Sequence, residues 1–205
     1  MAIPLLVAID VPREVSANIL RLRKFIVTRV GKDIYGSAAP NVTLFVNSFS
    51  NFNEVDKQLV QTTKKFKPFP LKVDGVHVFK DDPILKAHTV VYKLEKSAQL
   101  SKLHKEVVES LARLRTDDQA KWIFEQNPKM PQANKENLKR YGYPFGPEDS
   151  VLHASIGSYP AEKHTEIWKK AQQFDLTKKW AVASIAVYMV TDSGLKVLRT
   201  YKLGG

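Results

Sequence analysis

Residues 151–160 form the stretch that decides the fold, and they read Val151-Leu152-His153-Ala154-Ser155-Ile156-Gly157-Ser158-Tyr159-Pro160. Successive side chains of a β-strand point to opposite faces, so a strand here places His153 and Ser155 on one face and apolar side chains on the other. An imidazole beside a hydroxyl can transfer a proton and hold an anionic oxygen. A structural histidine in a strand gives the same pattern, so this stretch alone leaves both interpretations open.

A second stretch with the same alternation reads Asn41-Val42-Thr43-Leu44-Phe45-Val46, with Asn41 and Thr43 on one face. The residues after each stretch predict the same elements in the same order: a helix, a strand, a turn and a strand. These elements are expected at 53–66, 71–79, 81–83 and 87–94 after the first stretch, and at 161–174, 181–190, 192–194 and 195–203 after the second. Such an order indicates a duplication. Two halves related by a pseudo-two-fold axis would bring both motif strands to one cleft.

These patterns predict an α+β fold of two pseudo-symmetric lobes, each a small, mainly antiparallel sheet flanked by helices, with a central cleft. We expect a single domain over residues 1–205, with the lobes built around strands 41–46 and 151–157. The apolar run 3–9 indicates a buried strand that ends at Asp10. Apolar residues at three- and four-residue spacing indicate two amphipathic helices. Their apolar faces are Val15, Ile19, Leu22 and Ile26 in the first, and Leu100, Leu103, Val107, Leu111 and Leu114 in the second.

Composition narrows the class of protein. The 205 residues include no cysteine, which excludes disulfides and thiolate metal sites. No apolar run approaches the roughly 20 residues of a membrane span, and the N-terminus lacks the features of a signal peptide. We therefore expect a cytoplasmic protein without a membrane partner. The formal net charge of +11 indicates a polyanionic partner, most commonly nucleic acid, or a basic surface that only aids solubility.

Residues 117–149 are expected to form an irregular, proline-containing insertion just before the second motif. The insertion mixes cations with aromatic rings: Lys121, Lys129, Lys135, Lys139 and Arg140 with Trp122, Phe124, Tyr141, Tyr143 and Phe145. Cations can hold phosphates while aromatic rings stack on bases, and long loops in compact domains are usually functional or disordered. We expect a lid or flap in which Arg140, Tyr141 and Tyr143 bind substrate. The alternative is an insertion whose aromatic residues only attach it to the body.

The other histidines and the first helix have simpler interpretations. His77 lies in strand 71–79, which is expected to be irregular at Gly75, and it is either structural or a substrate contact at the rim of the cleft. His104 lies off the apolar stripe of its helix and is expected at the surface, and His164 is expected at a helix boundary. The outer face of the first helix is expected to carry Arg21, Arg23 and Lys24.

The chain resembles the two-histidine (2H) phosphoesterase superfamily, which includes the 2′-5′ RNA ligase proteins that act as RNA 2′,3′-cyclic phosphodiesterases. The signature of that superfamily is two copies of His-x-Thr/Ser, each on a strand, roughly half a chain apart. The second copy is intact here as His153-Ala154-Ser155. The resemblance extends over nearly the whole chain, through Leu5-Leu6-Val7-Ala8-Ile9-Asp10-Val11-Pro12, Pro40-Asn41-Val42-Thr43-Leu44, Gly75-Val76-His77-Val78-Phe79, Arg140-Tyr141-Gly142-Tyr143-Pro144 and Leu203-Gly204.

The first copy departs from the signature, because Asn41 stands where the family has histidine. In a member with both histidines, the resemblance implies that one takes a proton from an attacking water and the other protonates the leaving ribose oxygen. Asparagine cannot exchange a proton near neutral pH, and losing one general acid or base costs about 10²–10⁴ in rate. Three interpretations stay open: a weakly active variant helped by another group such as His77 or His88, a binding protein that retains the phosphate pocket, or an introduced substitution.

The function implied by the resemblance is opening of the 2′,3′-cyclic phosphate of an RNA end or nucleotide. In it His153 transfers a proton, Ser155 and Thr43 hold the phosphate, and Asn41 hydrogen-bonds to phosphate or water. We expect no metal ion or organic cofactor, because side chains supply the acid, base and phosphate donors, and we expect a monomer. The rival prediction is a non-catalytic module that binds an RNA end or a nucleotide, and a third is a phosphate pocket for a small metabolite.

Overall fold

The computed structural model describes residues 2–31, 38–82, 86–174 and 178–205. The strands are β1 (Ile3–Asp10), β2 (Asn41–Phe49), β3 (Phe69–Asp82), β4 (Ala87–Leu94), β5 (His153–Tyr159), β6 (Lys179–Val182), β7 (Ser184–Thr191) and β8 (Gly194–Lys202). The helices are α1 (Arg13–Val30), α2 (Phe52–Thr63), α3 (Ala98–Ala112), α4 (Asp118–Gln126), α5 (Gln132–Tyr141) and α6 (His164–Ala171), which follows the short 3-10 turn η1 (Ala161–Lys163). The predicted α+β class is confirmed.

The strands form one curled sheet in the order β6-β3-β4-β5-β2-β1-β7-β8, so the two motif strands, β2 and β5, lie at its centre. The chain runs through β1-α1-β2-α2-β3 and then repeats this order as β4-α3-β5-α6-β7, with α4 and α5 inserted before β5. The last strand of each unit pairs with the first strand of the other, β3 with β4 and β7 with β1. The duplication is therefore present in the topology, and each half of the sheet contains strands from both units.

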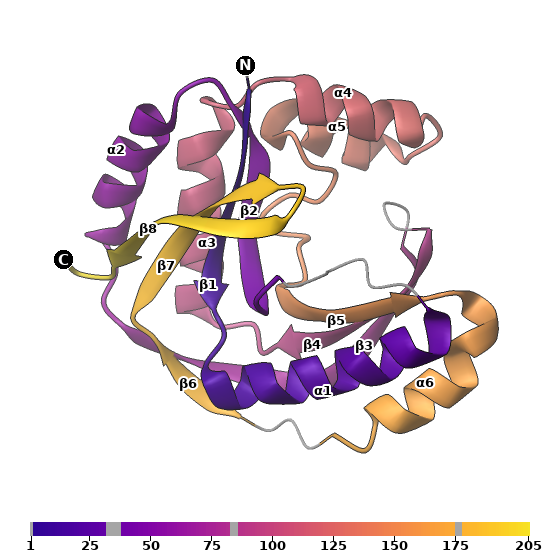
Figure 1. The fold of residues 1–205 in the computed structure, drawn as a ribbon. Coiled ribbons are helices and arrows are strands. Elements are labelled where there is room, and N and C mark those ends of the chain that lie inside the picture. The colour runs from indigo at the N-terminus through magenta and orange to yellow at the C-terminus, as the bar shows by residue number, and fades with distance from the viewer. Residues whose placement is uncertain (1, 32–37, 83–85, 175–177) are drawn as a thin grey trace.

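Helices cover the outer side of the curled sheet and enclose the core (Figure 1). Helix α1 packs on β5 and α6 packs on β4, while α3 packs on β2 and α2 packs on β8. The predicted apolar faces of α1 and α3 point into this core, where Ile19 and Leu103 are completely buried. On the motif strands, Val42 and Ala154 also point into the core. The residues on either side of each therefore face the opposite way, out of the core.

Two predicted elements differ from the structure. Residues 181–190 do not form one strand: the segment breaks at Ala183 into β6, which pairs with β3, and β7, which pairs with β1. The break lets one segment join both ends of the curled sheet. Residues 117–149 are not irregular throughout, because they contain α4 and α5. Two of the prolines that suggested a loop lie at helix boundaries, since Pro131 is the N-cap of α5 and Pro128 follows the C-cap of α4.

Two side chains that were predicted at the surface are buried. Arg23 is 5% exposed, because its guanidinium reaches backbone carbonyls beneath the sheet. His104 is also 5% exposed, and burial lowers its pKa to about 4, against the opposing effect of backbone hydrogen bonds with Leu44 and Pro147. His104 thus links α3 to the first motif strand and to the segment before the second.

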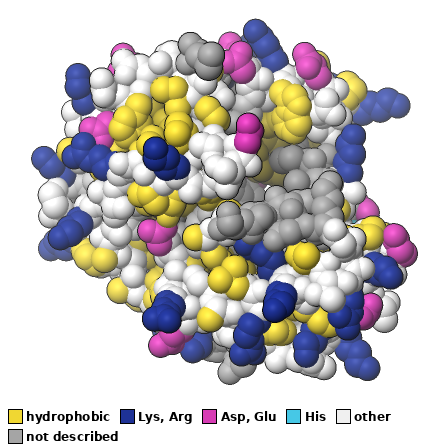
Figure 2. Space-filling model, viewed as in Figure 1, with side chains coloured by type: hydrophobic (Ala, Val, Ile, Leu, Met, Phe, Trp, Pro, Cys, Tyr) yellow, Lys and Arg dark blue, Asp and Glu magenta, His cyan; other side chains and the backbone are white. Residues whose placement is uncertain are grey.

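Other local predictions agree with the structure. The strand around Gly75 is irregular, with a register shift between Val73 and Gly75, and His164 begins α6. The predicted turn 81–83 differs in its described part, because Asp81 and Asp82 are the last residues of β3, and Pro83 lies outside the described residues. Lysine and arginine side chains lie around much of the molecular outline and are dense along its lower part, over α1 and α6 (Figure 2).

Candidate active site

The two motif strands are neighbours, and they pair antiparallel through Val42 and Ala154. These are the central residues of the two motifs, so the pseudo-two-fold axis passes between them. Residues directly opposite one another in an antiparallel pair point to the same face of the sheet. The register therefore sets Asn41 opposite Ser155, and Thr43 opposite His153, all on the face that points out of the core.

This face, called the motif face below, continues onto the neighbouring strands. One cross-strand row consists of His77, Val91, Ser155, Asn41 and Asp10, on β3, β4, β5, β2 and β1 respectively. The next row contains Lys93, His153, Thr43 and Ala8. The structure thus brings together all four predicted motif side chains and His77, and it adds Asp10 and Lys93 beside them.

His153 is held in one orientation from two sides. Its Nδ1 donates a hydrogen bond to the Val151 carbonyl at 2.6 Å, and its ring packs against Phe79 with the centroids 4.9 Å apart. Because Nδ1 carries the proton of this bond, Nε2 is the nitrogen that takes up or releases a proton. Burial lowers the pKa of His153, while the hydrogen bond to Val151 and the charge of Asp82 act in the opposite direction.

His77 and Lys93 flank this histidine. The His77 ring lies 5.5 Å from the Phe79 ring, centroid to centroid, so the rings of His77, Phe79 and His153 form a series. Lys93 lies opposite His153 on β4, and its Nζ forms an ion pair with Asp74 at 2.9 Å. The β5 side of the motif face therefore combines an imidazole, a hydroxyl and a nearby lysine side chain.

The first motif is bonded within itself. Thr43 Oγ1 donates to Asn41 Oδ1 at 3.3 Å, and Asn41 Nδ2 donates to the Ala39 carbonyl at 3.1 Å. The hydroxyl proton of Thr43 is thus already used in the hydrogen bond to Asn41. For Thr43 to donate to a phosphate oxygen, the hydroxyl must turn away from Asn41.

Arg23 fixes the two motif strands from the core side. Its guanidinium donates to the Ile156 carbonyl at 3.0 Å, to the Ser155 carbonyl at 3.3 Å and to the Ala38 carbonyl at 2.9 Å. Ala38 lies three residues before β2, so a single side chain from α1 connects the backbone of β5 with the segment that leads into β2. A buried guanidinium can serve several carbonyls at once because its donors form a rigid fork.

The predicted flap residues do not lie on the strands of the motif face. Tyr141 is 8% exposed and belongs to the hydrophobic core, and the Arg140 guanidinium lies over its ring at 4.9 Å. The Tyr141 and Gly142 carbonyls accept from Asn47 of β2 at 3.5 and 3.4 Å. Tyr143 is half-buried beside Phe145. The substrate-binding role of Arg140, Tyr141 and Tyr143 stays a prediction, and the contacts of Tyr141 attach the insertion to the body.

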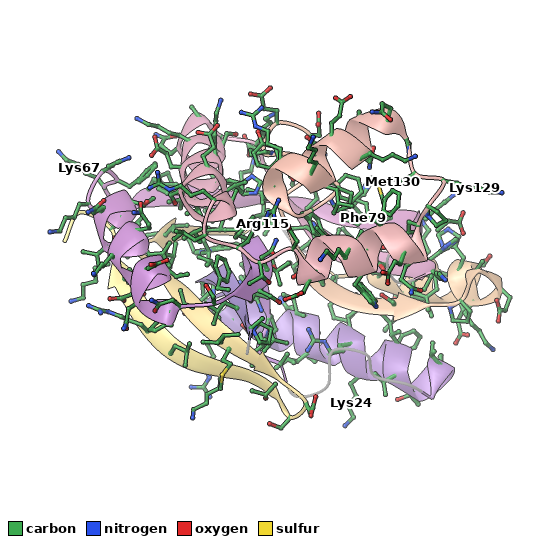
Figure 3. The ribbon with its side chains drawn as sticks, turned by 90° about the horizontal axis from the view of Figure 1, so that it is seen from above. Lys24, Lys67, Phe79, Arg115, Lys129 and Met130 are labelled. Atoms are coloured by element: carbon green, nitrogen blue, oxygen red, sulfur yellow. The ribbon has the colours of Figure 1, made fainter. Side chains whose placement is uncertain are left out.

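The insertion has a cavity of its own, of about 420 Å³. It lies between the α4–α5 connection and the loop after α5, and its lining includes Lys129, Met130, Asn134 and Phe145. Figure 3 shows Lys129 and Met130 on that connection, Phe79 and Arg115 nearer the middle of the molecule, and Lys24 and Lys67 pointing outward. This cavity is separate from the motif face, since none of its lining residues lies on β2 or β5.

Among the residues that the structure describes, no group of three or more His, Asp or Glu side chains is arranged to hold a metal ion. No helix within the described ranges is long and apolar enough to cross a membrane. The prediction that the reaction requires no metal ion stays a prediction.

The family model described as the 2′-5′ RNA ligase superfamily matches residues 11–193. The chain belongs to this superfamily. The superfamily includes phosphoesterases and ligases, so the chemistry that it supports is that of phosphoester bonds. No curated protein matches the chain in sequence.

Solved structures of the superfamily have the same fold along the whole chain. TT0787 of Thermus thermophilus is 15% identical, with a TM-score of 0.60, and the match covers 100% of this chain and 99% of that protein. LigT of E. coli in its apo form is 16% identical, with a TM-score of 0.57 and coverage of 98% and 97%. LigT complexed with 3′-AMP is 15% identical, with a TM-score of 0.53 and coverage of 99% of both chains. At these identities the likeness establishes the fold alone.

Three residues of the motif face or next to it were not predicted from the sequence: Phe79, Asp10 and Lys93. In the sequence, Phe79 indicates only the last residue of strand 71–79, and Asp10 indicates only the end of the first strand. The alternation of Ala8 and Asp10 was the available signal, since it places the carboxylate on the same face of the strand as Ala8. Lys93 carried no signal, because its relation to His153 depends on strand order.

Proposed function

We propose that this protein opens 2′,3′-cyclic phosphates of RNA ends or nucleotides by hydrolysis. The observation that carries the proposal is the pairing of Val42 with Ala154, which puts the polar side chains of both motifs on one face. Directly opposite side chains in such a pair have Cβ atoms about 5 Å apart, so a single phosphate group can contact both strands. Membership of the superfamily makes a phosphoester the expected ligand.

In the proposed reaction, a water oxygen attacks phosphorus and the bond from phosphorus to one ribose oxygen breaks. The water loses a proton, and the departing ribose oxygen gains one, which leaves a phosphomonoester beside a free hydroxyl. His153 exchanges one of these protons through Nε2. The hydroxyls of Ser155 and Thr43 donate to phosphate oxygens, and Asn41 hydrogen-bonds to phosphate or water. LigT, which shares the fold, has been solved with 3′-AMP, and a nucleotide monophosphate is the product class expected here.

The second candidate is a non-catalytic module that binds RNA ends or nucleotides. Two features of the first motif favour it. The amide of Asn41 cannot act as an acid or a base near neutral pH, and the Thr43 hydroxyl already donates to Asn41. The net charge of +11 suits a polyanion in either case. We expect a monomeric, cytoplasmic protein under both proposals.

Hydrolysis of a 2′,3′-cyclic nucleotide by the unmodified chain, by His153→Ala and by Asn41→His tests the proposal. We expect turnover by the unmodified chain, loss of turnover in His153→Ala, and faster turnover in Asn41→His. An Asn41→His variant that is inactive, together with oligonucleotide binding by the unmodified chain that weakens with salt, would favour the binding module. Nucleotide binding without any affinity for oligonucleotides would favour a pocket for a small metabolite.

A further inference from the structure

One carboxylate lies beside the position where the first motif lacks its histidine. Asp10 is the last residue of β1 and is directly opposite Asn41 in the β1–β2 ladder. Its side chain is exposed on the motif face, and the Cβ atoms of such opposite residues lie about 5 Å apart. An asparagine side chain is shorter than that of histidine, so Asn41 does not reach the position that the distal ring nitrogen of a histidine would take.

The carboxylate is oriented by a buried tyrosine. The Tyr188 hydroxyl donates a hydrogen bond to Asp10 Oδ1, and the Tyr188 ring packs with Ala8 and Ala186, both completely buried. The small alanine side chains let the ring lie close to the sheet. Burial raises the pKa of Tyr188, as do the hydrogen bond and charge of Asp10, so the phenol keeps its proton and stays a donor.

This arrangement leaves the second carboxylate oxygen available. Within residues 2–31, 38–82, 86–174 and 178–205, no hydrogen bond or ion pair reaches Oδ2 of Asp10. One oxygen is therefore anchored, while the other can accept a proton from a water held next to Asn41. Anchoring one oxygen and leaving the other to react is the arrangement required of an oriented general base.

We propose that Asp10 is the general base that replaces the missing histidine of the first motif. The role rests on the proposed hydrolysis of a cyclic phosphate. A water between Asp10 and phosphorus gives its proton to Oδ2 as its oxygen bonds to phosphorus. The phosphorus–oxygen bond to the ribose breaks, and that ribose oxygen takes a proton from Nε2 of the His153 imidazolium. Asp10 then returns the acquired proton through solvent, and His153 is reprotonated.

The positions of the charges fit this division of roles. Asp10 approaches from β1, whereas His153 and Lys93 lie on β5 and β4, on the other side of Asn41 and Thr43. The phosphate lies between a base and an acid, as in-line attack requires. Its negative charge is nearest to the cationic groups of the β5 side, while Oδ2 of Asp10 meets the attacking water and Oδ1 stays bonded to Tyr188.

His77 and His88 could also act as the general base, but both lie further from Asn41 than Asp10 does. His77 is three strands away from Asn41 in the same row, about 14 Å at the usual spacing of strands, and it lies on the same side of the phosphate as His153. His88 is 6% exposed, pairs with Tyr159 on β5, and its Nδ1 accepts from the Asp81 backbone N–H at 3.2 Å. His88 is thus buried in a contact that does not reach the motif face.

A double-mutant cycle between positions 10 and 41 tests the assignment. Turnover of 2′,3′-cyclic AMP is measured for the unmodified chain, Asp10→Asn, Asn41→His and the double variant. We expect Asp10→Asn to lower kcat of the unmodified chain by at least about 10²-fold. In the Asn41→His background the histidine supplies the base, so the same change should lower kcat by less than about threefold. Asp192→Asn, which removes an exposed carboxylate from the β7–β8 turn, is the matched control and should leave kcat unchanged.

Each other outcome overturns the assignment in a recognisable way. An Asp10→Asn variant as active as the unmodified chain removes Asp10 from the mechanism while the proposed hydrolysis stands. Equal losses in both backgrounds show that Asp10 acts independently of position 41 and does not replace its histidine. Turnover only in variants with Asn41→His shows that Asp10 supplies no base. If all four chains are inactive although thermal melts show them folded, the proposed hydrolysis itself fails.

Discussion

The two motif strands occupy equivalent positions about the Val42–Ala154 pair, yet their polar side chains are in different states. On β5, Nδ1 of His153 donates to the Val151 carbonyl, which makes Nε2 the nitrogen that can exchange a proton. On β2, Thr43 donates to Asn41, and Asn41 donates to the Ala39 carbonyl. The comparison shows that the two motifs share a backbone arrangement but differ in the hydrogen bonds of their polar side chains.

The largest difference between the strands should appear on removing the first residue of each motif. We expect His153→Ala to lower kcat for a 2′,3′-cyclic nucleotide by about 10²–10⁴-fold, because it removes a proton-transfer group. Asn41→Ala is the matched change on β2, and it should cost only about 3–10-fold, since it removes a hydrogen-bonding amide. Equal losses in the two variants would show that the strands contribute alike and would contradict the comparison.

The third residue of each motif gives the next largest effect. We expect Ser155→Ala to lower kcat/KM by about 10–100-fold, as expected for losing a hydrogen bond to a charged phosphate. Thr43→Val should cost less, because the Thr43 hydroxyl must first give up its bond to Asn41. A larger loss for Thr43→Val than for Ser155→Ala, measured under the same steady-state conditions, would reverse the order of the two strands.

The pH dependence of kcat/KM reports the environment of His153 on the β5 side. Burial lowers the pKa of His153 below the usual 6.5, and the proposed acid must be protonated in the free enzyme. We therefore expect kcat/KM to fall as pH rises through a midpoint below 6.5. His77, Asp82 and Lys93 are the charged or titratable groups near this ring from β3 and β4.

Phe79→Leu sharpens this prediction, because it removes the ring that packs against His153 and lets water reach the imidazole. The midpoint in that variant should move up towards 6.5, whereas Phe49→Leu, in the core of the same sheet, should leave it unchanged. A kcat/KM that instead rises with pH through the same midpoint would make His153 the base and not the acid.

The smallest expected effect concerns the attachment of the insertion to β2. Gly31 and Gly142 both end helices with positive φ, 73° and 74°, so alanine strains the backbone at either site by about 1–2 kcal/mol. A Cβ at Gly31 meets nothing within 4 Å, whereas one at Gly142 would lie 2.3 Å from Nδ2 of Asn47. Gly142→Ala should therefore lower the melting temperature more than Gly31→Ala, with little change in kcat, and an equal shift would contradict the contact.

The alternation of residues in 41–46 and 151–157 was sufficient to predict both motif strands and their shared face. It was sufficient because strand periodicity is local and the duplication supplied an internal comparison. The exchange of strands between the two units was not predictable, since the pairing of β3 with β4 and of β7 with β1 depends on contacts between distant segments.

The predictions that failed for single residues have a common physical cause. Arg23 looks like part of a basic helix surface until β5 places carbonyls over it. Asp10 looks like a strand end until β2 places Asn41 opposite it. His104 lies outside the apolar stripe of α3, but its hydrogen bonds with Leu44 and Pro147 compensate for burial. In each case the deciding partner is far away in the sequence.

A shared anion site requires that one phosphate group reach the hydroxyls of Thr43 and Ser155, on two strands that are far apart in the chain. The most direct measurement is an NMR titration with adenosine 2′-monophosphate that follows the His153 ring nitrogens and the amides of Thr43 and Ser155 together. We predict that both amides shift along one binding curve and that the pKa of His153 rises on binding, with both effects weakened in the Thr43→Val, Ser155→Ala double variant. Separate binding curves for the two amides, or a nucleotide that leaves either strand unaffected, would contradict a shared anion site.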